Sequence, residues 1–325
     1  MATLIYDNLG FAFRKVARLT ARGLARVGYR ECRLIPIHSL FYEYSYPAVV
    51  IYDTKLYERK SRIVRAATRS RLALWLDSPV EPSALNPEHF EGAVHLTTLP
   101  YWLREYSRVG VPVHGWVPRP VDYETAVEVS RLPREYVCRD LWSRYGRYVI
   151  MVGSDNRVAP SKPPRKGVDA YDAVCAELRG VRCLYVGSWD PRNAVKVSGV
   201  GGLGEYSLLR LVRCAEVFVW PSRSEGFGMP PVEAMAVGTV VVSSTAPFND
   251  LVVGVKFDYR DVVVSYCPEV GFPFRLFDYD VRELRSAVEQ ALEMPEDEKE
   301  ELRVEGTVRR ELFRPDLVAL AVTQA

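Results

Sequence analysis

The fold is constrained most strongly by a repeated alternation of short, β-rich apolar runs with helix-like segments. In the first half of the chain, the apolar runs lie at residues 3–7, 32–37, 47–53, 71–77 and 92–98. The pattern restarts in the second half, with runs at residues 147–154, 181–188, 216–222 and 239–244. Helix-like segments separate many of these runs, as at residues 13–28, 165–178 and 205–215. Because strand, helix and strand at this spacing are typical of βαβ units, we predict an α/β chain with two Rossmann-like, doubly wound domains.

The restart places a domain boundary near residue 145, after a charged, proline-containing stretch that we interpret as a linker. A length of 325 residues is sufficient for two such domains. We predict a first domain over residues 1–145, a second over 146–300, and a helical segment over 301–325 that could pack back on the first domain. Ligands of doubly wound sheets bind beyond the carboxyl ends of the strands, so the expected site is a central cleft that the two domains face.

Charge is distributed unevenly along a chain whose formal net charge is only +2. Residues 1–145 carry 21 basic and 15 acidic side chains, a balance of +6, whereas residues 146–325 carry 22 and 26, a balance of −4. This pattern is compatible with solvated helix faces. It is equally compatible with a first domain that meets an anionic partner, such as a phosphorylated acceptor or an acidic membrane surface. No nucleic-acid partner is expected, because the basic first domain lacks a recognised nucleic-acid-binding module.

The sequence also bears on location and metal content. No stretch approaches the roughly 18 apolar residues of a membrane span, and the N-terminus lacks the basic region of a signal peptide. We therefore expect a cytoplasmic protein, with peripheral membrane contact as an extension of the basic first domain. The six cysteines are scattered without a CxxC pair, so no zinc site and no metal are expected.

Amino-acid usage fits a thermophile. Arg outnumbers Lys 35 to 8, and the chain has only five Asn and two Gln. Cytoplasmic cysteines of mesophiles are reduced, whereas hyperthermophile proteins can carry internal disulfides. The redox state of the cysteines therefore stays open at this point.

The segment PSRSEGFGMPPVEAMAVG, residues 221–238, contains two glutamates eight positions apart, Glu225 and Glu233. It follows an apolar run and precedes a helix-like segment, so it lies at the carboxyl end of a strand. Pro231 suits the first turn of a helix, which puts Glu233 in that turn and Glu225 in the loop. Glu233 could then simply complement the helix dipole, and Glu225 could be a surface acid. A metal site with two carboxylates lacks a third ligand nearby.

The glycines of this segment favour a functional interpretation. Gly226 and Gly228 let the backbone approach a ligand closely. The N-terminus of a helix attracts phosphate through its exposed N–H groups and its dipole. The loop and the helix start together therefore form a reasonable cradle for a diphosphate.

The longer segment PSRSEGFGMPPVEAMAVGTVVVSS, residues 221–244, resembles the signature of the retaining glycosyltransferase family usually numbered 4, the glycosyl transferases of group 1. The family hallmark is a glutamate, seven residues and a second glutamate, which Glu225 and Glu233 match. The resemblance implies the GT-B architecture and transfer of a sugar, of the hexosyl type, from a UDP- or GDP-sugar to an acceptor with retention. It further implies that the first domain binds the acceptor, that the second binds the donor, and that no metal is needed.

The resemblance also implies roles for single residues. Glu225 would face the donor sugar as a catalytic residue, and Glu233 would accept hydrogen bonds from the ribose hydroxyls. The backbone of Gly226, Phe227, Gly228 and Met229 would lie against the donor phosphates.

Matches outside this segment are less complete. Lys166, followed by Gly167, fits the catalytic lysine that binds the donor diphosphate. The arginine that normally accompanies it is replaced by Ser154, and Arg157 or Arg165 could substitute for it.

Two glycines resemble further elements of the donor site. Gly187, in LYVGSWDP, matches a turn near the nucleotide base. Gly10, in DNLGFAF, matches the glycine loop after the first strand, although that loop has one glycine here rather than two.

The first domain departs from the family pattern at its expected histidine. Asp77 stands where many members carry that histidine, and it could bind a sugar hydroxyl as a third catalytic residue. Arg119 and Pro120 replace an Asn-Gly pair, so no side-chain role transfers to them. Two alternatives to the transferase therefore stay open. One is a degenerate protein that binds nucleotide sugars without turnover, and the other is an epimerase or phosphorylase of the same architecture.

Overall fold

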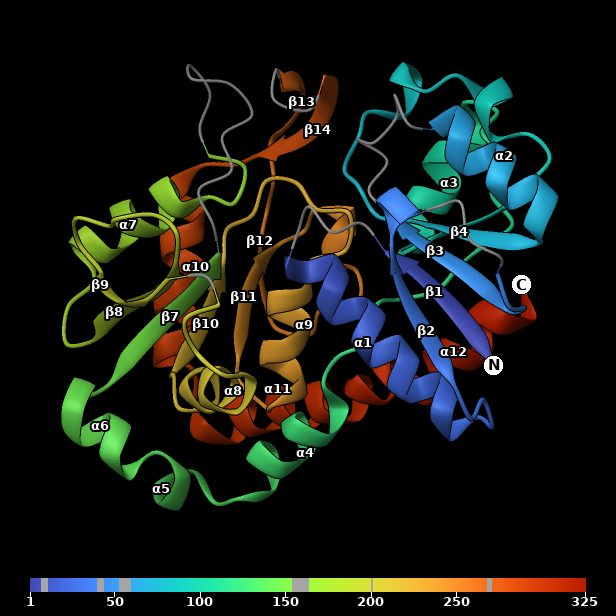
Figure 1. Ribbon diagram of the computed structural model, residues 1–325. Coiled ribbons are helices and arrows are strands. Elements are labelled where there is room, and N and C mark those ends of the chain that lie inside the picture. The colour runs from blue at the N-terminus through green and yellow to red at the C-terminus, as the bar shows by residue number, and fades with distance from the viewer. Residues whose placement is uncertain (7–10, 40–43, 53–59, 154–163, 200, 268–270) are drawn as a thin grey trace. The chain divides into compact units, whose positions relative to one another are not determined.

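The computed structural model describes residues 1–6, 11–39, 44–52, 60–153, 164–199, 201–267 and 271–325. The chain forms two compact units (Figure 1). The N-terminal unit comprises residues 1–122, 268–274 and 312–325, and the C-terminal unit comprises residues 123–267 and 275–311. Each unit contains one six-stranded sheet, and all the strand pairs within both sheets are parallel. The prediction of two Rossmann-like, doubly wound sheets is confirmed.

The sheet of the N-terminal unit has the strand order β2-β1-β3-β4-β5-β6. Its strands are β1 (Ala2–Tyr6), β2 (Cys32–Pro36), β3 (Ala48–Tyr52), β4 (Leu72–Leu76), β5 (Val94–Thr97) and β6 (Gly115–Trp116). Its helices are α1 (Phe11–Arg26), α2 (Lys60–Ser70), α3 (Pro100–Arg108) and α12 (Pro315–Gln324). Every residue of β3 is buried, as expected of a central parallel strand that is covered on both faces.

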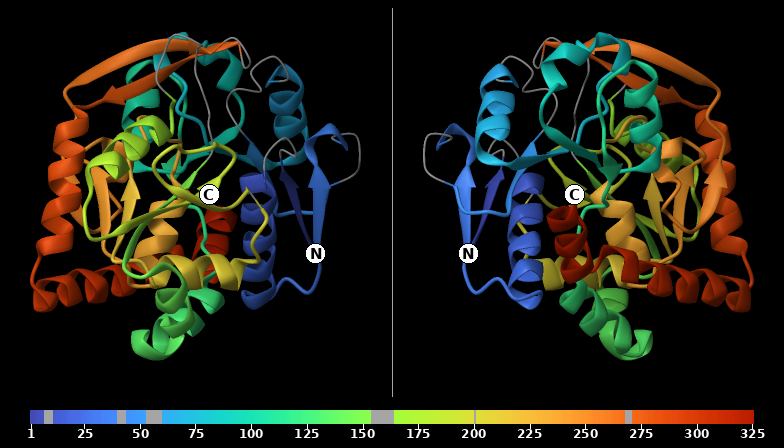
Figure 2. Two further views of the ribbon diagram at one scale, coloured as in Figure 1. Left: turned by 90° about the vertical axis from the view of Figure 1, so that its left-hand side faces the viewer. Right: turned by 90° about the vertical axis from the view of Figure 1, so that its right-hand side faces the viewer.

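Helix α12 packs directly on α1, although some 290 residues separate them in the chain (Figure 2). The contact depends on Gly23 in the middle of α1. A Cβ atom at this position would lie 1.8 Å from the carbonyl oxygen of Pro315, so only glycine allows this separation of the two helices. The C-terminal helix thereby becomes part of the N-terminal unit.

The sheet of the C-terminal unit has the order β12-β11-β10-β7-β8-β9. Its strands are β7 (Tyr148–Gly153), β8 (Arg182–Gly187), β9 (Val195–Ser198), β10 (Val217–Trp220), β11 (Val241–Ser244) and β12 (Val255–Phe257). Its main helices are α7 (Val168–Glu177), α8 (Glu205–Arg213), α9 (Met229–Ala236), α10 (Val281–Glu293) and α11 (Glu296–Arg309). The strand order reverses between the neighbours β7 and β10, which makes the ends of these two strands the topological switch point.

The structure corrects the interpretation of the segment before residue 145 as a linker. It folds into three helices, α4 (Tyr123–Arg131), α5 (Arg134–Val137) and α6 (Arg139–Tyr145). Helix α4 packs on α8, and a disulfide joins Cys138, which follows α5, to Cys214 after α8. The proline and charges that suggested a linker lie on the surface of this helical layer.

Two further elements were not anticipated from the sequence. Strands β13 (Asp261–Cys267) and β14 (Phe272–Asp278) form a two-stranded sheet. Short 3-10 turns also occur at residues 37–39, 82–84, 87–90, 247–249 and 310–313. None of the described helices combines the length and apolar character needed to cross a lipid bilayer.

Four of the cysteines form two disulfides in the structure, which answers the open question of their redox state. Cys138 and Cys214 are separated by 76 positions, whereas Cys175 and Cys183 are separated by only eight. A disulfide stabilises a protein mainly because it restricts the unfolded chain. From the loop lengths, we expect the Cys138–Cys214 bond to contribute about 4–5 kcal/mol to the free energy of unfolding and the Cys175–Cys183 bond about 2–3 kcal/mol. Both bonds lie in the C-terminal unit and should stabilise it.

We therefore predict that Cys138→Ala/Cys214→Ala lowers the unfolding temperature more than Cys175→Ala/Cys183→Ala. Differential scanning calorimetry with and without reductant would test this. Cys32→Ser removes a cysteine that is free in the structure and serves as the control. If reductant leaves the unfolding temperature of the wild-type protein unchanged, the disulfides do not contribute as inferred.

Candidate functional site

The candidate site lies at the switch point of the C-terminal sheet, where two chain segments meet. One is the turn at residues 164–167 that leads into α7, and the other is the loop at residues 221–228 that follows β10. The backbone N–H of Arg223 donates to the carbonyl of Arg165 at 2.8 Å. Gly167 has a φ of 70°, and a Cβ atom there would lie 2.0 Å from the carbonyl oxygen of Pro221. A glycine is therefore required for this close approach of the two segments.

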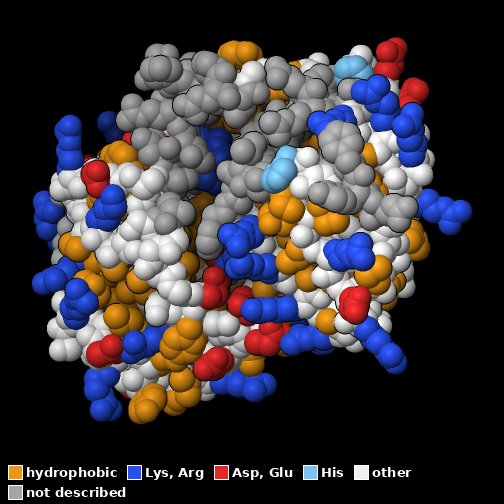
Figure 3. Space-filling model, in the orientation of Figure 1, with side chains coloured by type: hydrophobic (Ala, Val, Ile, Leu, Met, Phe, Trp, Pro, Cys, Tyr) orange, Lys and Arg blue, Asp and Glu red, His pale blue; other side chains and the backbone are white. Residues whose placement is uncertain are grey.

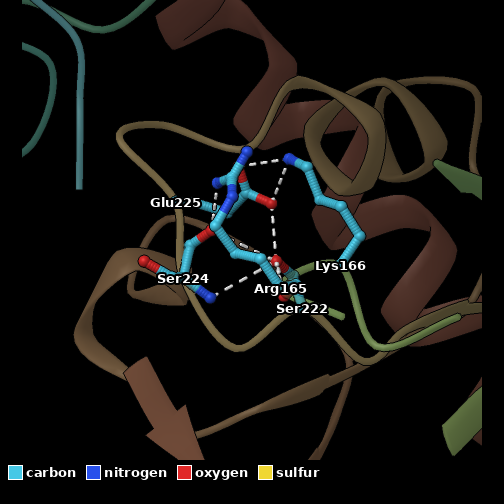
Figure 4. A network of polar contacts seen from close by, with 5 residues as sticks. All are labelled: Arg165, Lys166, Ser222, Ser224 and Glu225. Carbon is cyan, nitrogen blue, oxygen red and sulfur yellow. Dashed lines mark hydrogen bonds and ion pairs between the residues drawn. The ribbon is translucent and has the colours of Figure 1, made fainter. Parts of the chain in front are cut away.

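Glu225 is the centre of a polar network between these segments (Figure 4). The ammonium of Lys166 donates to both carboxylate oxygens, at 2.5 and 2.7 Å. The hydroxyl of Ser222 donates to Oε1 at 2.6 Å. On the other side, Nη1 of Arg165 lies 3.6 Å from Oε2 and donates to the carbonyl of Ser224 at 2.6 Å. The structure thus brings the predicted residues Glu225 and Lys166 into direct contact and adds Arg165 beside them.

The environment of Glu225 decides its protonation state. The residue is only 4 % exposed. Burial alone would raise its pKa, but Lys166, Arg165 and the hydrogen bonds outweigh burial and hold the pKa below its usual range. Stabilisation from this pair is therefore complete above the ordinary glutamate pKa of about 4.3 and is lost as the pH falls through the lower folded pKa. At neutral pH, Glu225 is a hydrogen-bond acceptor and not an acid.

Within the network itself, positive charges outnumber negative ones. Lys166 and Arg165 contribute two positive charges against the single negative charge of Glu225. The ammonium of Lys166 also lies 5.3 Å from the ring centroid of Trp220, at the end of β10. The cation and this ring therefore form a cation–π contact. Two cations at the ends of parallel strands are suited to bind a phosphate-containing ligand.

The start of helix α9 corrects one prediction. The helix begins at Met229, with Gly228 as its N-cap in the left-handed region at φ 85°. Glu233 therefore lies in the second turn of the helix and not in its first. It is 8 % exposed and remains close to the switch point because the short helix leads directly from the glycine loop.

The other predicted donor-site residues have different outcomes. Phe227 is buried at 3 % exposure, in the loop before α9. Gly187 ends β8, and a Cβ atom there would lie 1.7 Å from the carbonyl oxygen of Gly153 on β7, so sheet packing alone requires this glycine. Gly10, Ser154 and Arg157 lie outside the described residues.

Asp77 lies in the N-terminal unit, directly after β4. Its Oδ2 accepts a hydrogen bond of 3.1 Å from Nε of Arg119, whose side chain is completely buried. The guanidinium centre of Arg119 lies 4.1 Å from the ring centroid of Trp75. The indole of Trp75 in turn donates to the carbonyl of Val117 at 2.9 Å. No family role transfers to Arg119, but its side chain has a structural contact of its own, because it holds the carboxylate of Asp77.

Sequence reasoning also missed the contacts of Ser222 and Arg223, which precede Glu225. Their positions in a polar stretch resemble those of ordinary loop residues. The one signal available was their adjacency to the first glutamate of the motif. Among the described residues, no group of three or more His, Cys, Asp or Glu side chains is arranged to hold a metal ion.

Comparison with known proteins agrees with this geometry. Residues 146–264 match the family model described as glycosyl transferases group 1. A putative glycosyltransferase 41 of Sulfolobus islandicus filamentous virus is 38 % identical over 101 residues, 31 % of this chain and 30 % of that protein. The phosphatidyl-myo-inositol mannosyltransferase of Mycobacterium tuberculosis is 30 % identical over 141 residues, 39 % of this chain and 34 % of that protein. These matches span about a third of the length of the curated relatives.

Solved structures share the fold over the whole chain. Sucrose-phosphate synthase from Thermosynechococcus elongatus matches 99 % of this chain and 97 % of its own, with a TM-score of 0.67 and 18 % identity. Anabaena HepE, solved in complex with UDP and glucose, matches 100 % of this chain and 98 % of its own, with a TM-score of 0.61 and 12 % identity. The two parallel six-stranded sheets are those of the GT-B fold. The chain therefore has the GT-B fold, and its residues 146–264 are similar to the glycosyl transferases of group 1.

Proposed function

We propose that this protein is a retaining glycosyltransferase that transfers a hexosyl group from a UDP- or GDP-sugar to an acceptor hydroxyl. The observation that carries the proposal is the buried network of Glu225, Lys166 and Arg165 at the switch point of the C-terminal sheet. It combines cations for a diphosphate with a carboxylate that is ionised at neutral pH. The group 1 match over residues 146–264 supports the same assignment.

The network suggests how the leaving group is handled. As the bond between the anomeric carbon and the diphosphate oxygen breaks, negative charge develops on the diphosphate. Lys166 and Arg165 stabilise that charge, and the N–H groups at the start of α9 add to it. These cations do the work that a bound metal does in other transferases, so we propose that the reaction is independent of metal. Loss of the diphosphate leaves an oxygen that can take the proton of the acceptor hydroxyl on the same face of the sugar.

The carboxylates bind and orient the donor. Glu225 accepts hydrogen bonds from donor-sugar hydroxyls once the diphosphate has taken its place at Lys166. Glu233 accepts hydrogen bonds from the ribose hydroxyls. In the N-terminal unit, Asp77 is held by Arg119 at the end of β4 and accepts a hydrogen bond from a sugar hydroxyl. Each of these groups offers an ionised acceptor, which forms the stronger class of hydrogen bond.

The first prediction from the proposed function concerns turnover. Purified protein incubated with UDP- and GDP-hexoses and candidate acceptors should form glycoside that retains the donor's anomeric configuration, including in EDTA. Mass spectrometry and NMR of the product would show this. Lys166→Met should reduce turnover by a hundredfold or more, on the order expected for loss of one charge-stabilising group. Lys196→Met, which removes an exposed lysine of the same unit, is the control.

Other outcomes would separate the alternatives. Strict dependence on a divalent cation would contradict the proposal as stated. Nucleotide-sugar binding without transfer to any acceptor would favour a binding protein that has lost turnover. A changed sugar configuration in the absence of acceptor would favour an epimerase.

The second prediction concerns Glu225. In the structure, the carboxylate of Glu225 accepts hydrogen bonds from the ammonium of Lys166. A diphosphate would need the same ammonium. Glu225→Gln should therefore abolish transfer while it tightens binding of UDP or GDP by roughly fivefold, which corresponds to about 1 kcal/mol. Isothermal titration calorimetry measures the affinity, and Glu216→Gln, which pairs with Arg147 elsewhere in the unit, is the control. Weaker nucleotide binding by Glu225→Gln would mean that the carboxylate organises the cations and does not compete for them.

The acceptor side of the proposal rests on the basic faces of α1 and α2. Arg14, Arg18, Arg22 and Arg26 follow one another at intervals of four along α1 and are exposed. Helix α2 exposes three further arginines, at positions 62, 65 and 69. Blue side chains accordingly stand out over these helices in Figure 3. We propose that this surface meets an anionic membrane or a lipid-phosphate acceptor. A mycobacterial relative is named for action on phosphatidyl-myo-inositol.

The third prediction tests this surface. Each basic side chain near an anionic membrane contributes about 1 kcal/mol, so Arg14→Gln/Arg18→Gln/Arg26→Gln should weaken binding on the order of a hundredfold. Co-sedimentation with vesicles of phosphatidylcholine, with and without phosphatidylserine, measures the effect. Arg22 is left intact because it contacts Asp122. A triple variant of the exposed arginines 139, 144 and 182 in the C-terminal unit is the control. Equal binding to both kinds of vesicle would refute the proposal.

A further inference from the structure

Arg223 is a buried cation of the C-terminal unit. Its side chain is 4 % exposed. Two of its nitrogens donate to the carboxylate of Asp169, at 2.9 and 3.2 Å, and Nη1 also donates to the carbonyl of Pro164 at 2.8 Å. Its Nε donates to Asp278 at 3.2 Å. The guanidinium centre lies 4.9 Å from the ring centroid of Tyr279. One side chain therefore links its own loop to two other chain segments.

The backbone of Arg223 joins the same segments. Its N–H donates to the carbonyl of Arg165 at 2.8 Å, and its carbonyl accepts from the N–H of Phe277 at 2.7 Å. The hydroxyl of Tyr279 donates to the carbonyl of Pro221, two residues before Arg223. The turn at 164–167, the loop at 221–225 and the end of β14 are thus joined around one residue.

The position of Arg223 between the two catalytic segments gives these contacts a consequence for the site. The turn carries Arg165 and Lys166, and the loop carries Glu225. The separation of the ammonium of Lys166 and the carboxylate of Glu225, 2.5 Å at its shortest, is set by how these two segments are joined. Beside the direct contacts of the network and the backbone hydrogen bond from Arg223 to Arg165, the guanidinium of Arg223 joins them through Pro164 and Asp169.

A buried ion pair is weak evidence of stabilisation. Removing the guanidinium from water costs several kcal/mol, and the side chains of Asp169 and Asp278 stay 37 % and 48 % exposed, which weakens the attraction that offsets this cost. Burial would lower the pKa of Arg223, but Tyr279 and the carboxylates of Asp169 and Asp278 outweigh burial and raise it, so the group stays charged. A guanidinium, unlike an apolar side chain, is a rigid planar group whose N–H donors spread as a fork. This fork fixes the direction of several acceptors at once.

We propose that Arg223 is a positioning residue of the donor site. Its guanidinium holds the turn at 164–167 against the loop at 221–225, so that Lys166 and Arg165 remain on either side of Glu225. The inference rests on the proposed function, because it assigns to Arg223 the geometry of the groups that would bind the donor diphosphate. Lysine would keep the charge and lose the fork, so it should not replace arginine here.

The competing role is that of a structural anchor, and the chain offers a matched control for it. Arg303 on α11 is also 4 % exposed and forms ion pairs with two carboxylates, those of Glu296 and Glu300. It belongs to the same unit but not to the two segments of the switch point. Arg303→Met should therefore destabilise the protein in the same way without changing the donor site.

The experiment compares diphosphate with monophosphate binding. UDP, UMP, GDP and GMP are titrated calorimetrically into the wild-type protein, Arg223→Met, Arg223→Lys and Arg303→Met, and each unfolding temperature is recorded. The wild-type protein should bind the diphosphate more tightly. Both Arg223 variants should lose tenfold or more of that preference while they retain monophosphate binding. Arg303→Met should lower the unfolding temperature and keep the preference. If Arg223→Met does not fold, Asp278→Asn removes one partner of the fork and should reduce the preference in the same direction.

Each remaining outcome contradicts a defined part of the argument. If the Arg223 variants lower the unfolding temperature but keep the preference for diphosphate, Arg223 is only an anchor and the inference fails while the proposed function stands. A wild-type preference in Arg223→Lys would show that charge suffices and would overturn the role of the fork. If the wild-type protein binds none of the four nucleotides, the proposed function fails and the inference fails with it.

Discussion

The burial of the Glu225 carboxylate is the constraint on which the switch point of the C-terminal sheet depends. An unpaired charge at 4 % exposure would cost several kcal/mol, so the carboxylate needs partners within hydrogen-bond reach. The hydroxyl of Ser222 comes from the same loop as Glu225, whereas the ammonium of Lys166 meets this need only if the turn before α7 touches the loop after β10. Gly167 allows that contact, because a side chain there would collide with Pro221. The position of β7 beside β10 brings the two segments to the same end of the sheet.

The parts of the site that follow one another in the chain could be predicted from sequence. Glu225 and the glycine loop lie between an apolar strand and a helix, and this local pattern fixes their place at the carboxyl end of β10. The role of Arg223 could not be predicted, since an arginine in a polar loop resembles a solvated side chain. Its burial depends on Asp169 and Asp278, which are 54 and 55 positions away. Contacts over such distances arise from the packing of the folded unit, and no local period or spacing encodes them.

The difference between local patterns and long-range contacts also explains which parts of the fold differ from the prediction. Apolar runs identified nine strands of the two sheets, because a buried parallel strand needs a continuous apolar run. The short edge strands β6, β9 and β12 were not predicted. The segment before residue 145 contains proline and many charges, and these features suggested a linker. Its helices are held in place by a layer that forms only in the folded unit, in which Trp142 donates to the carbonyl of Cys214 and Cys138 is bonded to the same residue. Glu233 was assigned to the first turn of α9 and lies in the second, because the helix begins directly after Gly228, which has a left-handed conformation.

The two units each place a carboxylate beside a cation at the ends of parallel strands, but the cations differ in a way that separates their roles. Arg119 is completely buried and stacks on Trp75, so it holds Asp77 in one orientation throughout any reaction. Lys166 is a compact ammonium on a flexible stem, and its side chain is 13 % exposed. In the proposed function it exchanges the Glu225 carboxylate for a diphosphate oxygen, whereas the fully buried side chain of Arg119 stays in place. Glu225 is therefore suited to change partners when the donor binds, and Asp77 is suited to present a fixed acceptor to a hydroxyl that approaches from one direction.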